Sequence, residues 1–244
     1  MRNKYLLFVF HLFNLTIYIV ILKGLADFSN MMSKTMTDNF NKEHRRINIL
    51  DNFRMYFFTT WNYILQIIFA AIAVVDESSK FINLPLSLQK YLGPTRTYLF
   101  NTFVFPCSLL VMTVFWGLWS IDRELIFPEA IDKYFPSYLN HGLHTFIIVP
   151  VIVESFVPKK HHFVEFKNMV WVLFAFMTVY QILFISAYYT DNVWLYPIYD
   201  YMSWPLRLIY SVGQLVVVLI YQKAGLILQF GREANGGKVR QKIN

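Results

Sequence analysis

Charged residues are scarce in this sequence. Asp, Glu, Lys and Arg together make up 15% of the 244 residues, whereas a soluble globular domain carries about 25%. Apolar residues make up 56% and aromatic residues 19%, and the mean hydropathy is +0.41. Lipid is the solvent that suits such a composition. The sequence therefore predicts an all-α, polytopic membrane helical bundle and argues against a soluble domain.

Cysteine is nearly absent, because Cys107 is the single one in the chain. An intramolecular disulfide is excluded, and a thiol in an apolar run usually packs without reacting. A clustered basic stripe is also lacking. The net charge is +7, but the Lys and Arg residues are scattered through the connecting segments and both ends. Nucleic acid is not expected as a partner; the basic residues are expected to set topology and to contact membrane lipids.

Apolar runs divide the chain into expected membrane spans. A transmembrane helix needs roughly 20 mostly apolar residues. Six segments qualify within a single transmembrane helical domain, residues 1–230: residues 5–26, 55–75, 98–120, 138–157, 169–189 and 204–228. The first is predicted to be an uncleaved span, although Gly24-Leu25-Ala26 also resembles a signal-peptide cleavage site. Residues 231–244 form a basic tail that is predicted to be mobile.

The Lys and Arg residues predict the orientation of these spans. More of them fall on the side of the N-terminus, residues 76–96 and the tail than on the opposite side. Both termini are therefore expected in the cytosol, although the basic segment 27–54 favours the opposite orientation. The endoplasmic reticulum and the plasma membrane are both candidate locations.

Polar side chains interrupt the second, fourth and sixth spans. Such groups are costly in lipid and usually face the interior of a bundle. The spacing i, i+3, i+4, i+7 places them on one face of a helix. Two sets have this spacing: Thr59, Asn62, Tyr63 and Gln66 in the second span, and Arg207, Tyr210, Ser211 and Gln214 in the sixth. In the fourth span, the polar residues cluster in the opening turns: Asn140, His141, His144 and Thr145.

Three stripes enter the membrane from one side. At 1.5 Å rise per residue, Thr59 and His144 lie roughly 6–9 Å inside their helix starts, and Arg207 is slightly shallower. A shared cavity would bring a hydroxyl, an imidazole and a guanidinium together near its mouth. Each residue also has an ordinary role: packing for the threonine, the membrane interface for the histidine, and headgroup contact for Arg207.

Metal binding is not expected in these stripes. His141 and His144 stand at i, i+3 and could share an ion, but no Asp, Glu or Cys accompanies them at that depth. A stable site needs three or four ligands. The prediction is therefore a site without metal or cofactor.

Several strings of residues carry a family resemblance. WSIDRELIFP at residues 119–128 precedes YLNHGLHT at residues 138–145, and WLYP follows at residues 194–197. With the second span around Thr59 and Gln66, they resemble the androgen-induced protein / androgen-dependent TFPI-regulating protein family. The resemblance covers nearly the whole chain from the second span to the sixth. It implies an integral-membrane threonine hydrolase that cleaves fatty acid esters of hydroxy fatty acids.

The resemblance also implies a catalytic pair. The family's threonine early in the second span and the last histidine of its N-H-G-x-H motif fall on Thr59 and His144. This chain reads Thr59-Thr60 at the first position. The spacing to Gln66 selects Thr59, and Thr60 stays an alternative.

A two-step hydrolysis follows from these assignments. His144 would accept the proton of the Thr59 hydroxyl, which attacks the ester carbonyl, and would later activate a water against the acyl-threonine. Asn62 and Asn140 are candidates to orient groups or to donate to the oxyanion. His141 is a less favoured base. Arg207 would bind the carboxylate of the substrate.

Two other classes of protein compete with a hydrolase. A membrane lipid transporter would show repeats and interrupted helices at matching positions of two halves. Pro150 interrupts the fourth span, but the sequence shows no matching half. A non-enzymatic signalling or structural membrane protein needs no converging threonine and histidine. The sequence therefore favours the hydrolase, with a lipid ester as substrate and membrane lipids as surroundings.

Overall fold

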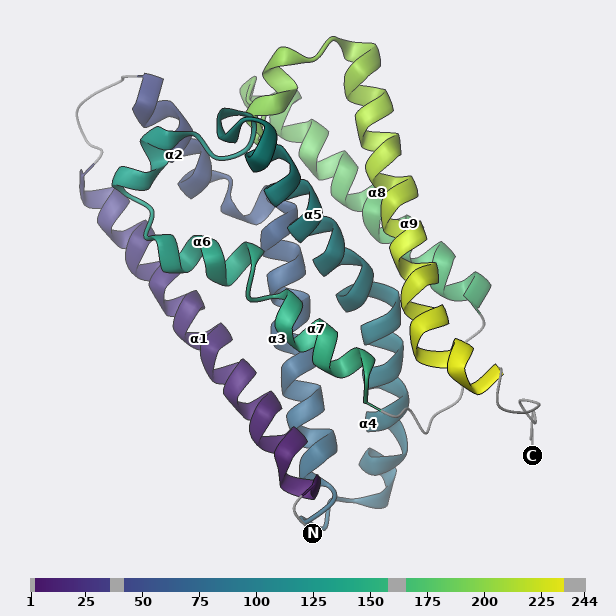
Figure 1. Cartoon of the computed structure of the whole chain (residues 1–244). Helices are drawn as coiled ribbons and strands as arrows, with labels where there is room; N and C mark the ends of the chain where they lie inside the picture. The colour runs from purple at the N-terminus through teal and green to yellow at the C-terminus, as the bar shows by residue number, and fades with distance from the viewer. Residues whose placement is uncertain (1–2, 36–41, 158–165, 235–244) are drawn as a thin grey trace.

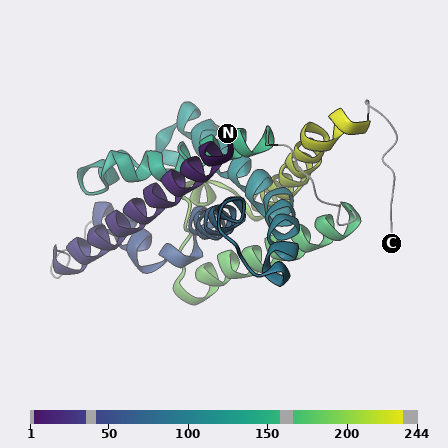
Figure 2. The same cartoon turned by 90° about the horizontal axis from the view of Figure 1, so that it is seen from below.

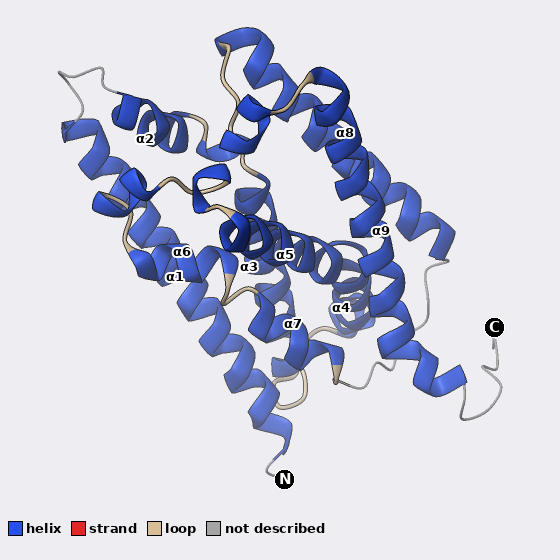
Figure 3. Cartoon of the chain, turned by 45° about the horizontal axis from the view of Figure 1, so that its top comes forward, coloured by secondary structure: helices blue, strands red, loops and turns tan. Residues whose placement is uncertain are grey.

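The structure is a computed structural model, and it describes residues 3–35, 42–157 and 166–234. Helices joined by loops make up these ranges, which contain no strand (Figure 3). The all-α fold class is therefore confirmed. The helices are α1 (Asn3–Thr35), α2 (Lys42–Asn52), α3 (Phe58–Ser78), α4 (Leu86–Leu99), α5 (Phe105–Ile121), α6 (Ser137–His144), α7 (Ile148–Ser155), α8 (Phe166–Asp191) and α9 (Trp204–Ala234).

Among the described residues, five helical stretches are long and apolar enough to cross a membrane: Tyr5–Met32, Phe58–Ser78, Leu86–Ile121, Lys167–Asp191 and Trp204–Gln229. They correspond to five of the six expected spans. The helix of the first span extends well beyond residue 26, so the start of the expected polar loop is helical. The last helix continues to Ala234, and the remainder of the expected tail lies outside the described residues.

The third span begins at Leu86, not at residue 98, because α4 runs into α5 through a π-helical turn, η2 (Phe100–Val104). Pro106 stands directly after this turn and has no N–H, so the Thr102 carbonyl loses its usual helical donor. The buried Gln222 side chain of α9 donates to that carbonyl at 3.4 Å. The irregular turn is thereby tied to the last helix.

The fourth expected span is not one continuous helix. It consists of α6 and α7, separated by the turn at residues 145–147. Pro150 explains the break, because its ring and its missing N–H are tolerated only in the first turn of a helix, where α7 places it. The Gln66 amide of α3 donates to the Ile147 carbonyl at 3.0 Å. The break therefore lies at a fixed point against α3.

Close packing holds α6 against α1. A Cβ atom at Gly142 would lie 2.6 Å from Cδ1 of Ile21, and one at Gly24 would lie 2.6 Å from the Tyr138 hydroxyl. Gly24 of α1 and Gly142 of α6 each face the other helix, and their lack of a side chain allows this close approach. Figure 1 shows α1 beside α3 and α6, with α8 and α9 together at the other flank. Figure 2, seen from below, shows α3 nearly end-on between α1 and α8.

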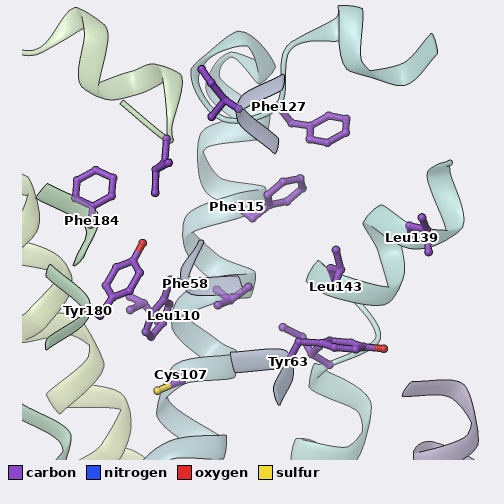
Figure 4. Close-up of a cluster of buried hydrophobic side chains, with 14 of the residues drawn as sticks. Phe58, Tyr63, Cys107, Leu110, Phe115, Phe127, Leu139, Leu143, Tyr180 and Phe184 are labelled. Carbon is purple, nitrogen blue, oxygen red and sulfur yellow. The ribbon is translucent and has the colours of Figure 1, made fainter. Parts of the chain in front are cut away.

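Buried apolar side chains from most of the helices form the main core. Figure 4 shows ten of its labelled members, which come from α3, α5, α6, α8 and the segment between α5 and α6: Phe58, Tyr63, Cys107, Leu110, Phe115, Phe127, Leu139, Leu143, Tyr180 and Phe184. Cys107 is fully buried here and has no disulfide partner. Its role as a packing residue agrees with the sequence-based expectation.

A second buried region contains charges. Arg96 of α4 binds both carboxylate oxygens of Glu154 at 3.0 and 2.7 Å, and it also binds Glu77 at 2.7 Å and Asp76 at 2.9 Å. The Arg96 side chain is only 5% exposed. The orientation argument counted Arg96 as a loop cation, and this was wrong. Four hydrogen bonds to carboxylates compensate its charge inside the bundle, so it carries no information about which side faces the cytosol.

Candidate functional site

A cavity of about 400 Å³ lies between α1, α3, α5, α6 and α8 and the segment that joins α8 to α9. Binding sites for small ligands commonly have volumes of roughly 300–1,000 Å³. Its walls are mostly aliphatic and aromatic side chains, among them Leu25, Val111, Val114, Phe115, Leu118 and Met177. Such a lining favours acyl chains over polar solutes.

Thr59 and His144 meet at the wall of this cavity. Thr59 stands in the first turn of α3 and His144 ends α6. The Thr59 hydroxyl lies 3.3 Å from the His144 Nε2. The two residues are 85 positions apart in the sequence, so only the packing of α6 beside α3 brings them together. This distance lies just beyond the usual reach for proton transfer, and such contacts are commonly longer without substrate.

Asn140 determines which nitrogen of His144 can accept a proton. The His144 Nδ1 lies 2.7 Å from the Asn140 side-chain oxygen and 3.0 Å from its carbonyl oxygen. Both are acceptors, so Nδ1 carries the proton and donates it, and the neutral Nε2 presents its lone pair to Thr59. Phe115 stacks on the imidazole at a centroid distance of 3.6 Å. These contacts fix both the tautomer and the plane of the ring.

Thr60 has a different environment from Thr59. Its hydroxyl donates to the Arg54 carbonyl at 2.6 Å. Arg54 begins η1 (Arg54–Tyr56), the turn that leads into α3. Thr60 also lines the cavity, but its hydroxyl proton is engaged and no base lies beside it. The geometry therefore pairs His144 with Thr59 and not with Thr60.

The other predicted site residues do not join this pair. Asn62 is fully buried, accepts from the Ser108 hydroxyl at 3.1 Å and is not part of the cavity wall. His141 is exposed and lies 3.1 Å from the Thr145 hydroxyl. Arg207 donates from Nε to the Tyr199 carbonyl at 2.9 Å and lies outside the cavity wall. The expected convergence of Arg207 with Thr59 and His144 does not occur, because aromatic rings of the α8–α9 segment hold the guanidinium.

Tyr196 lies beside the site, and the sequence did not predict this position for it. In the structure, the Tyr196 hydroxyl accepts from the Phe58 N–H at 3.1 Å and contacts the Tyr180 hydroxyl at 3.3 Å. Burial raises the pKa of Tyr196 to about 12, so this hydroxyl stays protonated near neutral pH. The WLYP string was the signal that could have pointed to it.

Metal binding has no evident ligand set in the part of the chain that the structure describes. No three His, Cys, Asp or Glu side chains gather there closely enough to hold an ion. Thr59 and His144 place a hydroxyl and an imidazole side by side at the cavity, a pair that can exchange a proton without a metal.

Fold and site together define a polytopic helical membrane protein with a hydroxyl–imidazole pair facing an apolar cavity. The chain matches the family described as FAR-17a/AIG1-like protein over residues 6–229. It belongs to that family.

Several curated proteins are similar to the chain. The androgen-dependent TFPI-regulating protein of Mesocricetus auratus is 36% identical over 159 residues, which cover 65% of this chain and 68% of the relative. The Homo sapiens protein of the same name is 30% identical, covering 69% and 73%. The androgen-induced gene 1 protein of Homo sapiens is 26% identical, covering 70% and 74%. No solved structure matches the chain.

Proposed function

We propose that this protein is an integral-membrane hydrolase that cleaves the ester bond of fatty acid esters of hydroxy fatty acids. Thr59 is the nucleophile and His144 is the general base. The observation that carries the proposal is the 3.3 Å contact between the Thr59 hydroxyl and the His144 Nε2 at the wall of an apolar cavity. An unaided threonine hydroxyl is a poor nucleophile, so an adjacent base is the feature that this chemistry requires.

Acyl transfer forms the first half of the reaction. The Thr59 oxygen attacks the ester carbonyl carbon while its proton passes to the His144 Nε2. The imidazolium is stabilised by the Asn140 side-chain oxygen on Nδ1. When the tetrahedral intermediate collapses, the carbon–oxygen bond to the hydroxy acid breaks and His144 returns the proton to the leaving oxygen. The hydroxy fatty acid leaves, and the fatty acyl group stays esterified to Thr59.

Hydrolysis of the acyl-threonine forms the second half. Water gives its proton to Nε2 and attacks the same carbonyl carbon, and the Thr59 oxygen leaves with that proton. The first turn of α3 supplies an oxyanion donor, because the Thr59 N–H lies where a helix has no internal acceptor and where the helix dipole favours negative charge. Asn62 is less suited to this role than the sequence suggested, since the cavity wall does not include it.

The cavity suits a lipid ester in the bilayer. Its wall includes side chains of the membrane-spanning helices α1, α3, α5, α8 and α9, together with residues of α2, α6 and the connecting segments. An acyl chain can therefore move from the membrane to Thr59 without exposing its apolar surface to water. A volume of about 400 Å³ accommodates the reacting ester and part of the attached chains.

The proposal is tested with purified protein in lipid nanodiscs and an ester of a hydroxy fatty acid as substrate. Thr59→Ala and His144→Ala are each expected to lower kcat by at least about 10³-fold, as expected for members of a nucleophile–base pair. Thr59→Ser keeps a hydroxyl and should retain measurable turnover. A fluorophosphonate probe should label the wild type and leave Thr59→Ala unlabelled.

Thr60→Ala is the matched control, since it removes the neighbouring hydroxyl. Full activity in Thr59→Ala with loss in Thr60→Ala would transfer the nucleophile to Thr60. Full activity in both variants would reject threonine catalysis altogether.

We also propose that both termini face the cytosol of an endoplasmic-reticulum or plasma-membrane protein. This orientation counts α6 and α7 together as one crossing of the membrane. The chain then crosses an even number of times, and α9 ends at the end of the bundle where α1 begins (Figure 1). Glycosylation sites inserted between α1 and α2 and between α8 and α9 should then be modified. Modification of a site at either terminus instead would reverse the orientation.

A further inference from the structure

The cavity wall contains one cation and one anion among the described residues, Arg54 and Asp51. The remaining lining side chains are apolar or uncharged, apart from the titratable His144. The Arg54 side chain is 59% exposed, although it lines the cavity. The cavity therefore reaches the surface of the protein at Arg54, and a positive charge stands at that opening.

The position of Arg54 is fixed with respect to the proposed nucleophile. The Thr60 hydroxyl donates to the Arg54 carbonyl at 2.6 Å, and the Trp61 indole N–H donates to the Met55 carbonyl at 2.8 Å. Both donors belong to the first turn of α3, which also carries Thr59. The η1 turn and the nucleophile thus belong to one rigid unit.

The Arg54 guanidinium has N–H donors with which it can bind a ligand. Its Nη1 donates to the Ser29 hydroxyl of α1 at 2.6 Å, and Asp51 lies 3.7 Å away. An arginine has five N–H donors in a planar fork, and only Nη1 is engaged with a described residue. Asp51 is close enough to attract the guanidinium, but the contact is long for a hydrogen bond. The fork can therefore bind a second anion.

Arg207, the sequence-based candidate for this task, is arranged differently. Its guanidinium lies 4.6 Å from the ring centre of Trp194 and 5.0 Å from that of Trp204, and its Nε is bonded to the Tyr199 carbonyl. It stabilises the α8–α9 segment and does not face the cavity.

We infer that Arg54 is the specificity-determining residue that binds a carboxylate of the lipid ester at the cavity mouth while the ester group lies at Thr59. This inference rests on the proposed function for the identity of the reaction. A guanidinium and a carboxylate form a planar, bidentate pair. The acyl chain of the substrate occupies the apolar part of the cavity, and the ionised end of the hydroxy acid stays at the opening. The protein would then prefer esters with a free acid over neutral esters.

The test compares two substrates that differ only in charge. Wild type, Arg54→Gln and Arg207→Gln are assayed in phosphatidylcholine nanodiscs on a fatty acid ester of a hydroxy fatty acid and on the methyl ester of the same compound. Arg54→Gln is expected to raise KM for the free acid about tenfold, the lower end for a charge-assisted hydrogen bond at an exposed site. KM for the methyl ester and both kcat values should stay within about twofold. Arg207→Gln should behave as the wild type on both substrates.

Asp51→Asn is a complementary variant, since it removes the anion that competes for Arg54. It is expected to lower KM for the free acid and to leave the methyl ester unchanged. A rise in KM for both substrates in Arg54→Gln would overturn the inference. The residue would then affect the shape of the opening and would not distinguish the free acid from the methyl ester. A change in free-acid selectivity in Arg207→Gln alone would assign the role to Arg207. If phosphatidylserine added to the nanodiscs abolishes the difference in KM for the free acid between the wild type and Arg54→Gln, a lipid headgroup and not the substrate occupies Arg54, and the inference is wrong.

Binding separates this inference from the proposed function. If the wild type hydrolyses neither ester, the proposed hydrolase activity fails, and affinity alone decides the role of Arg54. A free hydroxy fatty acid and its methyl ester are then titrated into wild type and Arg54→Gln. Selective loss of affinity for the free acid in Arg54→Gln supports the inference, and equal affinity in both proteins overturns it.

Discussion

Two polar regions lie inside this bundle, near opposite ends of α3. Thr59 and Glu77 are 18 positions apart in the sequence, which corresponds to about 27 Å along a helix. Around Glu77, the donors of Arg96 are bonded to three carboxylates, and its Nη2 also lies 2.9 Å from His11. Around Thr59, the hydroxyl and the His144 Nε2 hydrogen-bond only to each other among the described residues, at 3.3 Å.

The two regions differ in whether their polar groups can still interact with a ligand. A buried charge is tolerated when its partners are complete, and such a network has nothing left to offer a ligand. A hydroxyl and an imidazole beside an apolar cavity keep the capacity to react with what enters it. Burial of polar groups in a membrane bundle therefore does not by itself mark an active site; unfilled hydrogen-bonding capacity beside a cavity does.

The largest effect on stability is expected from removing the Arg96 cation. Arg96→Met removes the cation that binds Glu77 and Glu154 inside the bundle, so the free energy of unfolding should fall by about 3–5 kcal/mol. Thermal unfolding in detergent measures this loss. Thr59→Ala, in contrast, should cost less than about 1.5 kcal/mol while it abolishes activity.

Arg123→Met is the matched control for Arg96→Met. Its ion pair with Asp132 is partly exposed, with side chains 27% and 49% accessible, so the expected cost is about 0–1 kcal/mol. A stable Arg96→Met protein would show that the charged cluster is not structural and would remove the contrast between the two regions.

A smaller effect is expected from Gln66, which lies between the two regions along α3. Its amide accepts from Tyr18 at 2.8 Å and donates to Ser108 at 2.7 Å and to the Ile147 carbonyl at 3.0 Å. Gln66→Leu removes these three buried hydrogen bonds and should cost about 1–3 kcal/mol. Because the break before α7 loses its anchor, kcat should fall more than KM rises.

Gln181→Leu provides the comparison for Gln66→Leu, because the Gln181 side-chain oxygen has no hydrogen-bond partner among the described residues. This replacement should leave the unfolding temperature unchanged or raise it. Equal losses of stability in the two variants would contradict the anchoring role of Gln66.

The smallest of these effects should come from Asn140, which contacts His144 in the region around Thr59. Asn140→Leu removes the 2.7 Å contact to the His144 Nδ1 but keeps the backbone contact at 3.0 Å. We expect kcat to fall roughly tenfold, equivalent to about 1.4 kcal/mol. His141→Leu should leave kcat within about twofold, and a larger loss there would show that His141 takes part in proton transfer.

Apolar runs located five of the six expected spans as long helices, including the second and sixth with their polar stripes, and missed the irregular turn before Pro106. The helix of α8 lies close to residues 169–189, since its apolar run has clear ends. The π-helical turn before Pro106 was not predicted, because it needs Gln222 of another helix to satisfy the exposed carbonyl. The interruption of the fourth span was predicted from Pro150, but its anchoring by Gln66 was not, because that partner also comes from another helix. Arg96 was assigned to a loop because hydropathy alone treats every arginine as solvated.

The sequence by itself determined the class of protein and the polar residues of the second, fourth and sixth spans, because these depend on composition and on the spacing within one helix. Only the tertiary structure decided that Thr59 and not Thr60 faces His144, that Arg54 and not Arg207 lines the cavity, and that Arg96 is buried. These outcomes depend on which helices pack together, and helical periodicity fixes a face without fixing its neighbour.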